Sequence, residues 1–88
     1  MKVEFRESLY KDLRSIREKH LLDAVRETIV SIEQAATLGD IVHLKKLTGS
    51  KSHFRVRIGD FRLGLKVEGE NVIILRFLHR REIYRYFP

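Results

Sequence analysis

The segment from residue 79 to residue 86 gathers the side chains best suited to proton transfer near neutral pH. Its sequence, His79-Arg80-Arg81-Glu82-Ile83-Tyr84-Arg85-Tyr86, holds one histidine and two tyrosines among three arginines. Imidazole and phenol groups act as acids or bases, and guanidinium groups stabilise negative charge that develops in a transition state. Taken singly, the tyrosines fit a packing role and the histidine fits a hydrogen-bonded structural role. Their convergence favours acid–base chemistry on an anionic group.

An alternating stretch before this segment places more cations on one face of a predicted sheet. From residue 53, apolar side chains recur at every second position, which is the period of a half-buried strand, and the alternation resumes after Gly59-Asp60. Two residues between such strands form a tight hairpin loop. The polar face of this hairpin holds His53, Arg55, Arg57, Arg62, Gly64 and Lys66.

The hairpin register predicts a pair of like charges. A loop at Gly59-Asp60 places Arg57 opposite Arg62 and Arg55 opposite Gly64. Like charges directly opposite each other destabilise a sheet by up to about 1 kcal/mol, and a bound anion would offset that cost. The glycine would leave a gap where a sugar or base approaches the backbone. We interpret the face as a phosphate-binding surface; the alternative is an ordinary solvent face on which arginine stems cover apolar surface.

The distribution of charge favours a polyanionic partner. The 88 residues carry a net charge of +6, to which residues 1–50 contribute +1 and residues 51–88 contribute +5. Cations at strand-like spacing suit nucleic acid, although charge that serves only solubility gives the same composition. No apolar run approaches the roughly 20 residues that cross a bilayer, and the first residues lack a secretory pattern. We therefore expect a cytoplasmic protein with no membrane partner.

RNA cleavage by its own 2′-hydroxyl needs the groups that these two regions contain. A base takes the hydroxyl proton, cations stabilise the phosphorane-like transition state, and an acid protonates the departing 5′-oxygen. Metal chemistry is not expected, because the chain has no cysteine and its four histidines are scattered without carboxylates at ligand spacing. We expect neither a metal nor another cofactor.

Helical and strand patterns predict how these residues are positioned. Val3 and Phe5 alternate with charged residues in a half-buried opening strand, and Ser8 is a candidate N-cap. Two amphipathic helices follow, with a break near Lys19-His20, and Gly39 would end the second helix near residue 36. Their apolar stripes are formed by Leu9, Leu13, Ile16, Leu21, Leu22, Val25, Ile29 and Ile32.

The remaining segments complete a single predicted domain over residues 1–88. Residues 41–46 are expected to be a loop, and residues 72–78 form a third strand of the meander, apolar on both faces and therefore central. The element order is β-α-α-β-β-β. The predicted class is α+β, with a helical hairpin packed on a small, mostly antiparallel four-stranded sheet.

The chain resembles the RelE/ParE toxin superfamily, most clearly from residue 44 to its end. Three runs are similar to the family pattern in order and spacing: Leu47-Thr48-Gly49, residues 54–63 and residues 79–85. Length and element order match as well. The resemblance implies a RelE-like, microbial-ribonuclease-like fold and the toxin of a type II toxin–antitoxin system, an mRNA interferase that acts in the ribosomal A site. Its implied partners are mRNA on the ribosome and a cognate antitoxin, whose acidic or apolar helix covers the basic face or displaces the C-terminal segment.

The resemblance also implies roles for individual residues. The basic residues of the family's second strand fall on Arg55 and Arg57, the arginine of the third strand on Arg62, the later arginine on Arg80 and the tyrosine on Tyr84. RelE itself has lysines on the second strand, and one of them is thought to be the base. Arginine stays protonated at working pH, so Arg55 and Arg57 are expected to stabilise charge instead.

Proton transfer is then expected to pass to His79, as in relatives with a histidine near the C-terminus, assisted by Tyr84 or His53. We expect His79 to be the acid. The predicted catalytic residues are Arg57, Arg62, His79, Arg80 and Tyr84. The predicted RNA- or phosphate-binding residues are His53, Arg55, Lys66, Arg81 and Arg85.

Two other functions remain open at this point. A ParE-like toxin would inhibit DNA gyrase by binding it without catalysis, but those relatives generally lack the full basic and tyrosine set that is present here. An inactive RNA-binding relative would keep its affinity for RNA while the change from lysine to arginine removes turnover.

Overall fold

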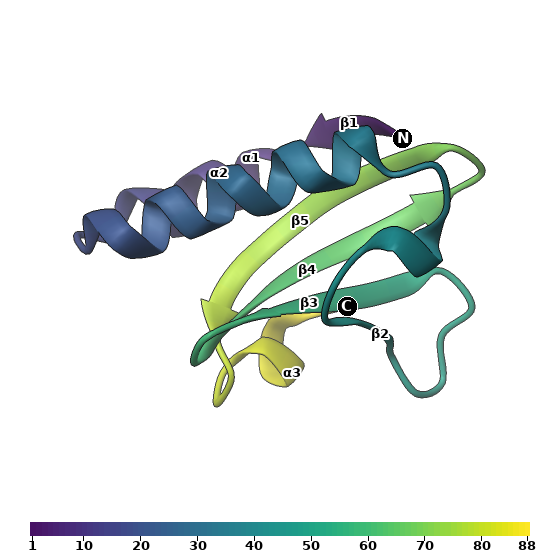
Figure 1. Ribbon diagram of the computed structural model, residues 1–88. Coiled ribbons are helices and arrows are strands. Elements are labelled where there is room, and N and C mark those ends of the chain that lie inside the picture. The colour runs from purple at the N-terminus through teal and green to yellow at the C-terminus, as the bar shows by residue number, and fades with distance from the viewer.

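The computed structural model describes residues 1–88 as an α+β fold with nine short elements (Figure 1). In chain order these are β1 (Lys2–Phe5), α1 (Glu7–Arg14), α2 (Lys19–Gln34), the 3-10 helix η1 (Leu38–Asp40), β2 (Leu44–Lys46), β3 (His53–Ile58), β4 (Phe61–Glu68), β5 (Asn71–His79) and α3 (Ile83–Tyr86). The strands form one sheet in the order β1-β5-β4-β3-β2, in which β1 is parallel to β5 and the other pairs are antiparallel. The predicted α+β class is confirmed, and the predicted order β-α-α-β-β-β recurs with three additions, η1, β2 and α3.

The β3–β4 hairpin has the predicted register. Arg57 pairs with Arg62 and Arg55 pairs with Gly64. Gly59 in the connecting turn has a φ of 58°, a left-handed conformation that glycine adopts without steric cost. Side chains therefore alternate as the sequence predicts, with Val56 and Ile58 buried on the face opposite the arginines.

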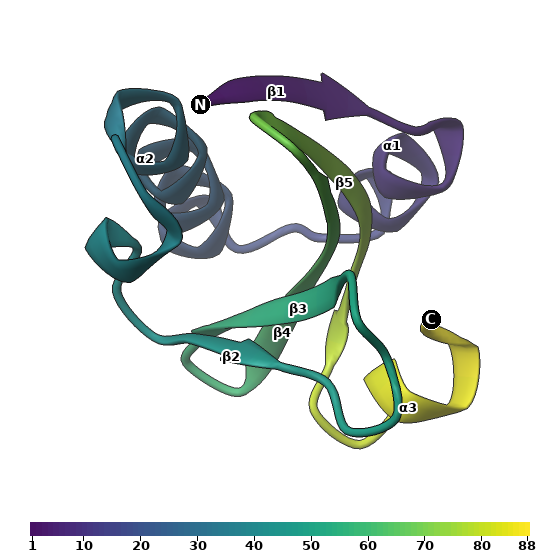
Figure 2. The same ribbon diagram turned by 90° about the vertical axis from the view of Figure 1, so that its right-hand side faces the viewer.

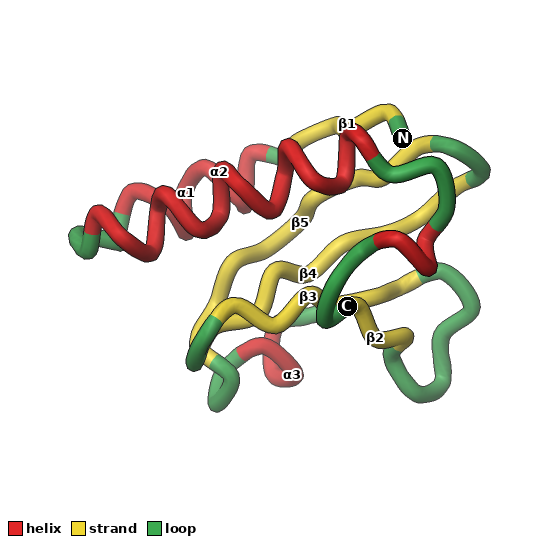
Figure 3. The backbone as a smooth tube through the Cα atoms, viewed as in Figure 1, coloured by secondary structure: helices red, strands yellow, loops and turns green.

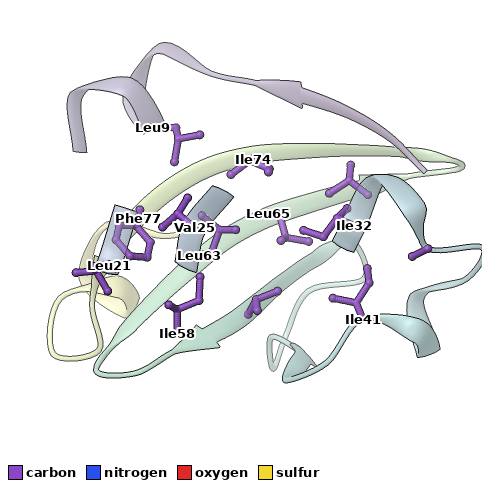
Figure 4. Close-up of a cluster of buried hydrophobic side chains, with 13 residues drawn as sticks. Leu9, Leu21, Val25, Ile32, Ile41, Ile58, Leu63, Leu65, Ile74 and Phe77 are labelled. Atoms are coloured by element: carbon purple, nitrogen blue, oxygen red, sulfur yellow. The ribbon is translucent and has the colours of Figure 1, made fainter. Parts of the chain in front are cut away.

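The hydrophobic core lies between α2 and one face of the sheet (Figure 4). Helix α2 contributes side chains at helical spacing and the strands contribute every second residue, so the two periodicities meet in one layer. In Figure 2 α2 lies over this face while α3 lies on the other side of the sheet. The buried residues from α2 and the sheet include Leu21, Val25, Ile32, Val56, Ile58, Leu63, Leu65, Val72, Ile74 and Phe77.

Strand β5 is fixed at its outer edge by two different elements. Strand β1 pairs only with residues 71–74, so the backbone of the second half of β5 needs other partners. Helix α1 supplies them, because Ser8 Oγ donates to the carbonyl of Leu75 at 2.6 Å and Asp12 Oδ2 accepts the backbone N–H of Phe77 at 2.9 Å. Asp12 also accepts both Nε (2.8 Å) and Nη2 (3.0 Å) of Arg76, a bidentate ion pair that raises the pKa of Arg76.

The predicted helix ends and the predicted burial of Phe5 are wrong. Ser8 is not the N-cap: Arg6 holds that position, and Ser8 instead bonds to β5. The break between the helices covers residues 15–18 and includes Ile16, so Lys19-His20 belongs to the first turn of α2. The side chain of Phe5 is exposed.

Gly39 does not end α2, which stops at Gln34. The next residue, Ala35, is extended, and the Asp40 carboxylate accepts the backbone N–H groups of Ala36 and Thr37 at 3.2 and 3.0 Å. This local hydrogen bonding turns the chain into η1 before the glycine is reached. None of the helices has the length and apolar character needed to cross a bilayer.

The expected loop at residues 41–46 contains a fifth strand. Residues 44–46 form β2 at the sheet edge, where Lys45 pairs with Arg55, and Figure 3 shows this short strand between two loops. The segment was expected to be a loop because three residues are too few to display an alternating pattern. Its pairing depends on β3, which lies later in the chain.

Replacing Asp12 with alanine should lower the free energy of unfolding by about 3 kcal/mol, because one substitution leaves the guanidinium of Arg76 and the N–H of Phe77 without their acceptor. Urea denaturation measures the change. Asp23→Ala is the matched control, since Asp23 pairs only with the exposed Lys19 and should cost less than about 0.5 kcal/mol. Equal losses in the two variants would contradict a structural role for the Asp12 pair.

Candidate nucleic-acid interface

Four arginines and a tyrosine converge on the sheet face opposite α2. Arg55 and Arg57 extend from β3, Arg62 from β4, Arg80 follows β5, and Tyr84 belongs to α3. The pKa of Arg62 is lowered, first by its burial and then by the positive charge of Arg55, with Arg57 and Arg80 acting in the same direction. The Tyr84 hydroxyl acts in the opposite direction. We call these five residues the arginine–tyrosine cluster.

Two of these arginines are held by the β3–β4 turn. The Nη1 group of Arg62 donates to the carbonyls of Gly59 and Phe61 at 3.0 and 2.9 Å. The backbone N–H of Arg80 donates to the carbonyl of Asp60 at 2.8 Å, and its Nε lies 4.0 Å from the Asp60 carboxylate. The turn thus fixes both cations at one end of the face, while their remaining N–H groups stay available to an anion.

The Arg55 side chain has one unsatisfied hydrogen-bond donor and lies beside a hollow. Its Nη1 donates to the carbonyl of His43 at 3.0 Å, but its Nε–H is buried and has no partner. A guanidinium has donors only, so this N–H is left without an acceptor. The adjacent hollow of about 380 Å³ is lined by Lys45, Lys46, Leu47, Thr48, Arg55, Tyr84, Phe87 and Pro88.

The C-terminal segment is anchored on this face by apolar side chains. Ile83 and Phe87 are buried against Leu47, while Tyr84 between them is 62% exposed. The ring of Phe87 covers Gly64, where a Cβ would lie only 3.0 Å from the ring carbons. The expectation that Gly64 leaves a gap for a sugar or base is therefore wrong, because the protein fills that gap with its own side chain.

His79 does not lie with the arginines. A β-bulge at Leu75 shifts the register between β4 and β5. Because of this shift, Arg62 pairs with Leu78 and Phe61 pairs with His79. The imidazole therefore points to the core face, where it packs edge-on against the Phe61 ring at 5.4 Å. Its Nδ1 accepts the backbone N–H of Arg81 at 3.1 Å. This register and the Phe61 contact place His79 on the other face of β5 from Arg76 and Leu78, and its role as the acid stays a prediction.

The other predicted binding residues are spread more widely than expected. His53 and Lys66 pair with each other at the far side of Phe87, where His53 contacts Ser50 Oγ at 2.8 Å and Lys66 lies 3.7 Å from Glu68. Exposed Arg81 and Arg85 lie in the turn before α3 and on α3 itself.

Sequence reasoning missed two residues at this site. Lys45 lies opposite Arg55 on β2, and His43 in the preceding turn places its Nδ1 3.3 Å from Nη2 of Arg57. Treating residues 41–46 as a loop removed the register that would have revealed Lys45. No local signal marks His43, because its neighbours in space come from β3.

No group of three or more His, Cys, Asp or Glu side chains lies close enough together to hold a metal ion.

Comparison with known proteins identifies the family. The model of "ParE toxin of type II toxin-antitoxin system, parDE" matches residues 3–84. This chain belongs to the RelE/ParE toxin family. It is 35% identical to Toxin RelE3 of Methanocaldococcus jannaschii over 89 residues, with both chains fully covered. The family and the toxin–antitoxin context expected from the sequence are thereby confirmed.

Solved structures of RelE relatives share the fold. The RelB–RelE antitoxin–toxin complex from Methanococcus jannaschii matches with a TM-score of 0.81 and 30% identity, covering 97% of this chain and 99% of that chain. The toxin–antitoxin complex RelBE2 from Mycobacterium tuberculosis matches with a TM-score of 0.71 and 28% identity, covering 90% and 96%. The RelE-like fold predicted from the sequence is confirmed, with five strands rather than four.

Removing one member of the cross-strand arginine pair should stabilise the unliganded RelE-family toxin. We expect Arg57→Gln to raise the free energy of unfolding by about 0.5 kcal/mol at low ionic strength, because the repulsion with Arg62 is removed. Added salt or inorganic phosphate should stabilise the wild type more than the variant. Urea denaturation at two ionic strengths tests this, with Lys19→Gln on exposed α2 surface as control. A variant that is less stable than wild type at low salt would contradict the repulsion.

Proposed function

We propose that this RelE-family toxin is an endoribonuclease that cleaves mRNA in the ribosomal A site through attack of a 2′-hydroxyl on the adjacent phosphate. The observation that carries the proposal is the grouping of Arg55, Arg57 and Arg62 on one face of the β3–β4 hairpin, with Arg80 bonded to the hairpin turn and Tyr84 lining the same hollow as Arg55. Their mutual repulsion costs stability in the free protein, and a phosphate diester supplies the negative charge that offsets it.

The roles follow from side-chain chemistry. Arg57, Arg62 and Arg80 stabilise the extra negative charge on the phosphorus oxygens in the transition state, as preorganised donors do in other enzymes. Arg55 and Lys45 bind a neighbouring phosphate along the strand. Tyr84, exposed and close enough to affect the pKa of Arg62, donates the proton that the departing 5′-oxygen needs. Tyr84 thus takes the part that the sequence alone assigned to His79.

A cognate antitoxin is the proposed protein partner. The two relatives of known structure described above are complexes with an antitoxin. The net charge of +6 and the arginine–tyrosine cluster favour an antitoxin segment with acidic residues, which would occupy the surface that mRNA needs. Binding of the antitoxin would then inhibit cleavage by competition for the same cations.

Primer extension on a defined mRNA, with and without programmed ribosomes, tests the nuclease. We expect cuts within A-site codons by the wild type, and a loss of about 10²-fold or more in rate for Arg62→Ala and Tyr84→Phe, because these variants lose charge stabilisation and the proton donor. Arg17→Ala, at an exposed position remote from the site, is the control and should cut normally.

Each other outcome identifies a different function. Cleavage of free RNA without ribosomes would keep the nuclease and remove the ribosome from the mechanism. Intact mRNA under both conditions would overturn the proposal, and inhibition of DNA gyrase supercoiling would then identify a ParE-like toxin. RNA binding without cleavage would identify an RNA-binding relative that has lost catalysis.

A further inference from the structure

The arginine–tyrosine cluster lacks a base for the reaction just proposed. Arginine side chains remain protonated at working pH and have no lone pair to accept a proton. His79 lies on the other face of the sheet, and the ring of His53 is held by Ser50 Oγ and the Phe87 ring. Cleavage by a 2′-hydroxyl still requires a group that accepts the hydroxyl proton. An additional residue must therefore reach the site.

His43 is the histidine that contacts this cluster. It precedes β2 in an exposed turn, and its Nδ1 lies 3.3 Å from Nη2 of Arg57. Because a guanidinium only donates hydrogen bonds, Nδ1 is the acceptor in this contact and carries a lone pair. The unprotonated imidazole, which is the form able to act as a base, is thus the form that fits the site.

The backbone of His43 is fixed to the same two arginines. Its carbonyl accepts Nη1 of Arg55 at 3.0 Å and the backbone N–H of Arg57 at 3.3 Å. The residue has a φ of 64°, a left-handed conformation that glycine, asparagine, aspartate and histidine adopt more often than other residues. Three contacts with β3 therefore hold the imidazole at the edge of the proposed phosphate site.

Charged side chains from two elements lie near the imidazole of His43. Arg55 and Arg57 face it from β3, and Glu27 of α2 lines the same groove of about 400 Å³ together with His43 and Arg57. A phosphate bound to Arg57 would draw the guanidinium away from Nδ1 and leave its lone pair beside the nucleotide.

We propose that His43 is the general base of this toxin, an inference that rests on the proposed nuclease function. Nδ1 of His43 takes the proton as the 2′-O–H bond breaks, and the freed electron pair forms the bond from the 2′-oxygen to phosphorus. The bond from phosphorus to the 5′-oxygen breaks, and the departing oxygen takes a proton from Tyr84. The products are a 2′,3′-cyclic phosphate and a 5′-hydroxyl, and both side chains then regain their starting protonation through solvent.

Two substitutions separate the ring from its backbone role. Glycine and asparagine both tolerate a positive φ, so His43→Gly and His43→Asn keep the carbonyl that binds Arg55 and Arg57. Asparagine also retains an oxygen that can accept from Arg57 but is not basic. His20→Asn, in exposed α2, is the matched control for the same change of residue type.

The deciding measurement is the single-turnover rate at which the toxin cleaves mRNA on programmed ribosomes, followed as a function of pH. We expect His43→Gly and His43→Asn to cut at least about 10²-fold more slowly than wild type and to lose the rise in rate with pH that deprotonation of an imidazole gives. Added imidazole should restore part of the rate of His43→Gly. Binding of an mRNA with a 2′-deoxy nucleotide at the cleavage position should be unchanged in both variants.

The inference and the proposed function fail in different ways. If wild type and His20→Asn cut but His43→Asn cuts equally fast with the same pH profile, His43 is not the base and the nuclease stands. Slow cutting with an unchanged pH profile and no response to imidazole would show that the ring only positions Arg57, which also overturns the inference. If the wild type leaves mRNA intact, the nuclease function falls and the inference falls with it.

Discussion

The pairing of Arg57 with Arg62 across the β3–β4 hairpin is the constraint on which the site depends. The repulsion between two adjacent guanidinium groups, up to about 1 kcal/mol, is small beside the hydrophobic stabilisation on the other face of the same strands. There, burial of side chains such as Val56 and Leu63 contributes about 1.5–3 kcal/mol each. The core therefore holds a charge arrangement that would not form by itself, and this leaves the arginines preorganised for an anion.

Apolar packing, not charge, explains why the C-terminal segment lies beside the arginines. Helix α3 spans four residues, too few to be stable as an isolated helix. Its position comes from Ile83 and Phe87, which pack against the sheet face beside the arginines. Gly64 is the one position in this part of β4 without a side chain, and the Phe87 ring fills that space. Tyr84 is thereby directed to the cluster by the apolar contacts on either side of it.

Helix α1 fixes the outer edge of strand β5. The Asp12 carboxylate accepts the backbone N–H of Phe77 in the part of β5 that β1 does not pair with. It also holds Arg76 in a bidentate ion pair. Arg76 is thereby kept out of the arginine–tyrosine cluster, and its guanidinium packs against the Tyr86 ring at 5.7 Å. Arg76 thus has a close carboxylate partner, whereas the only carboxylate paired with an arginine of the cluster is that of Asp60, 4.0 Å from Arg80.

The sequence by itself determined the α+β class, the hairpin register and the family, because these depend on local periodicity, on a two-residue turn and on contiguous motifs. It also placed Arg55, Arg57 and Arg62 on one face of the hairpin, and the resemblance to the family added Arg80 and Tyr84 as predicted site residues. Only the tertiary structure decided which histidine reaches them. The bulge at Leu75 reverses the alternation along β5 and turns His79 to the core, while pairing of β2 with β3 brings His43 to Arg57. Both outcomes depend on contacts between strands, which a pattern along one strand does not contain.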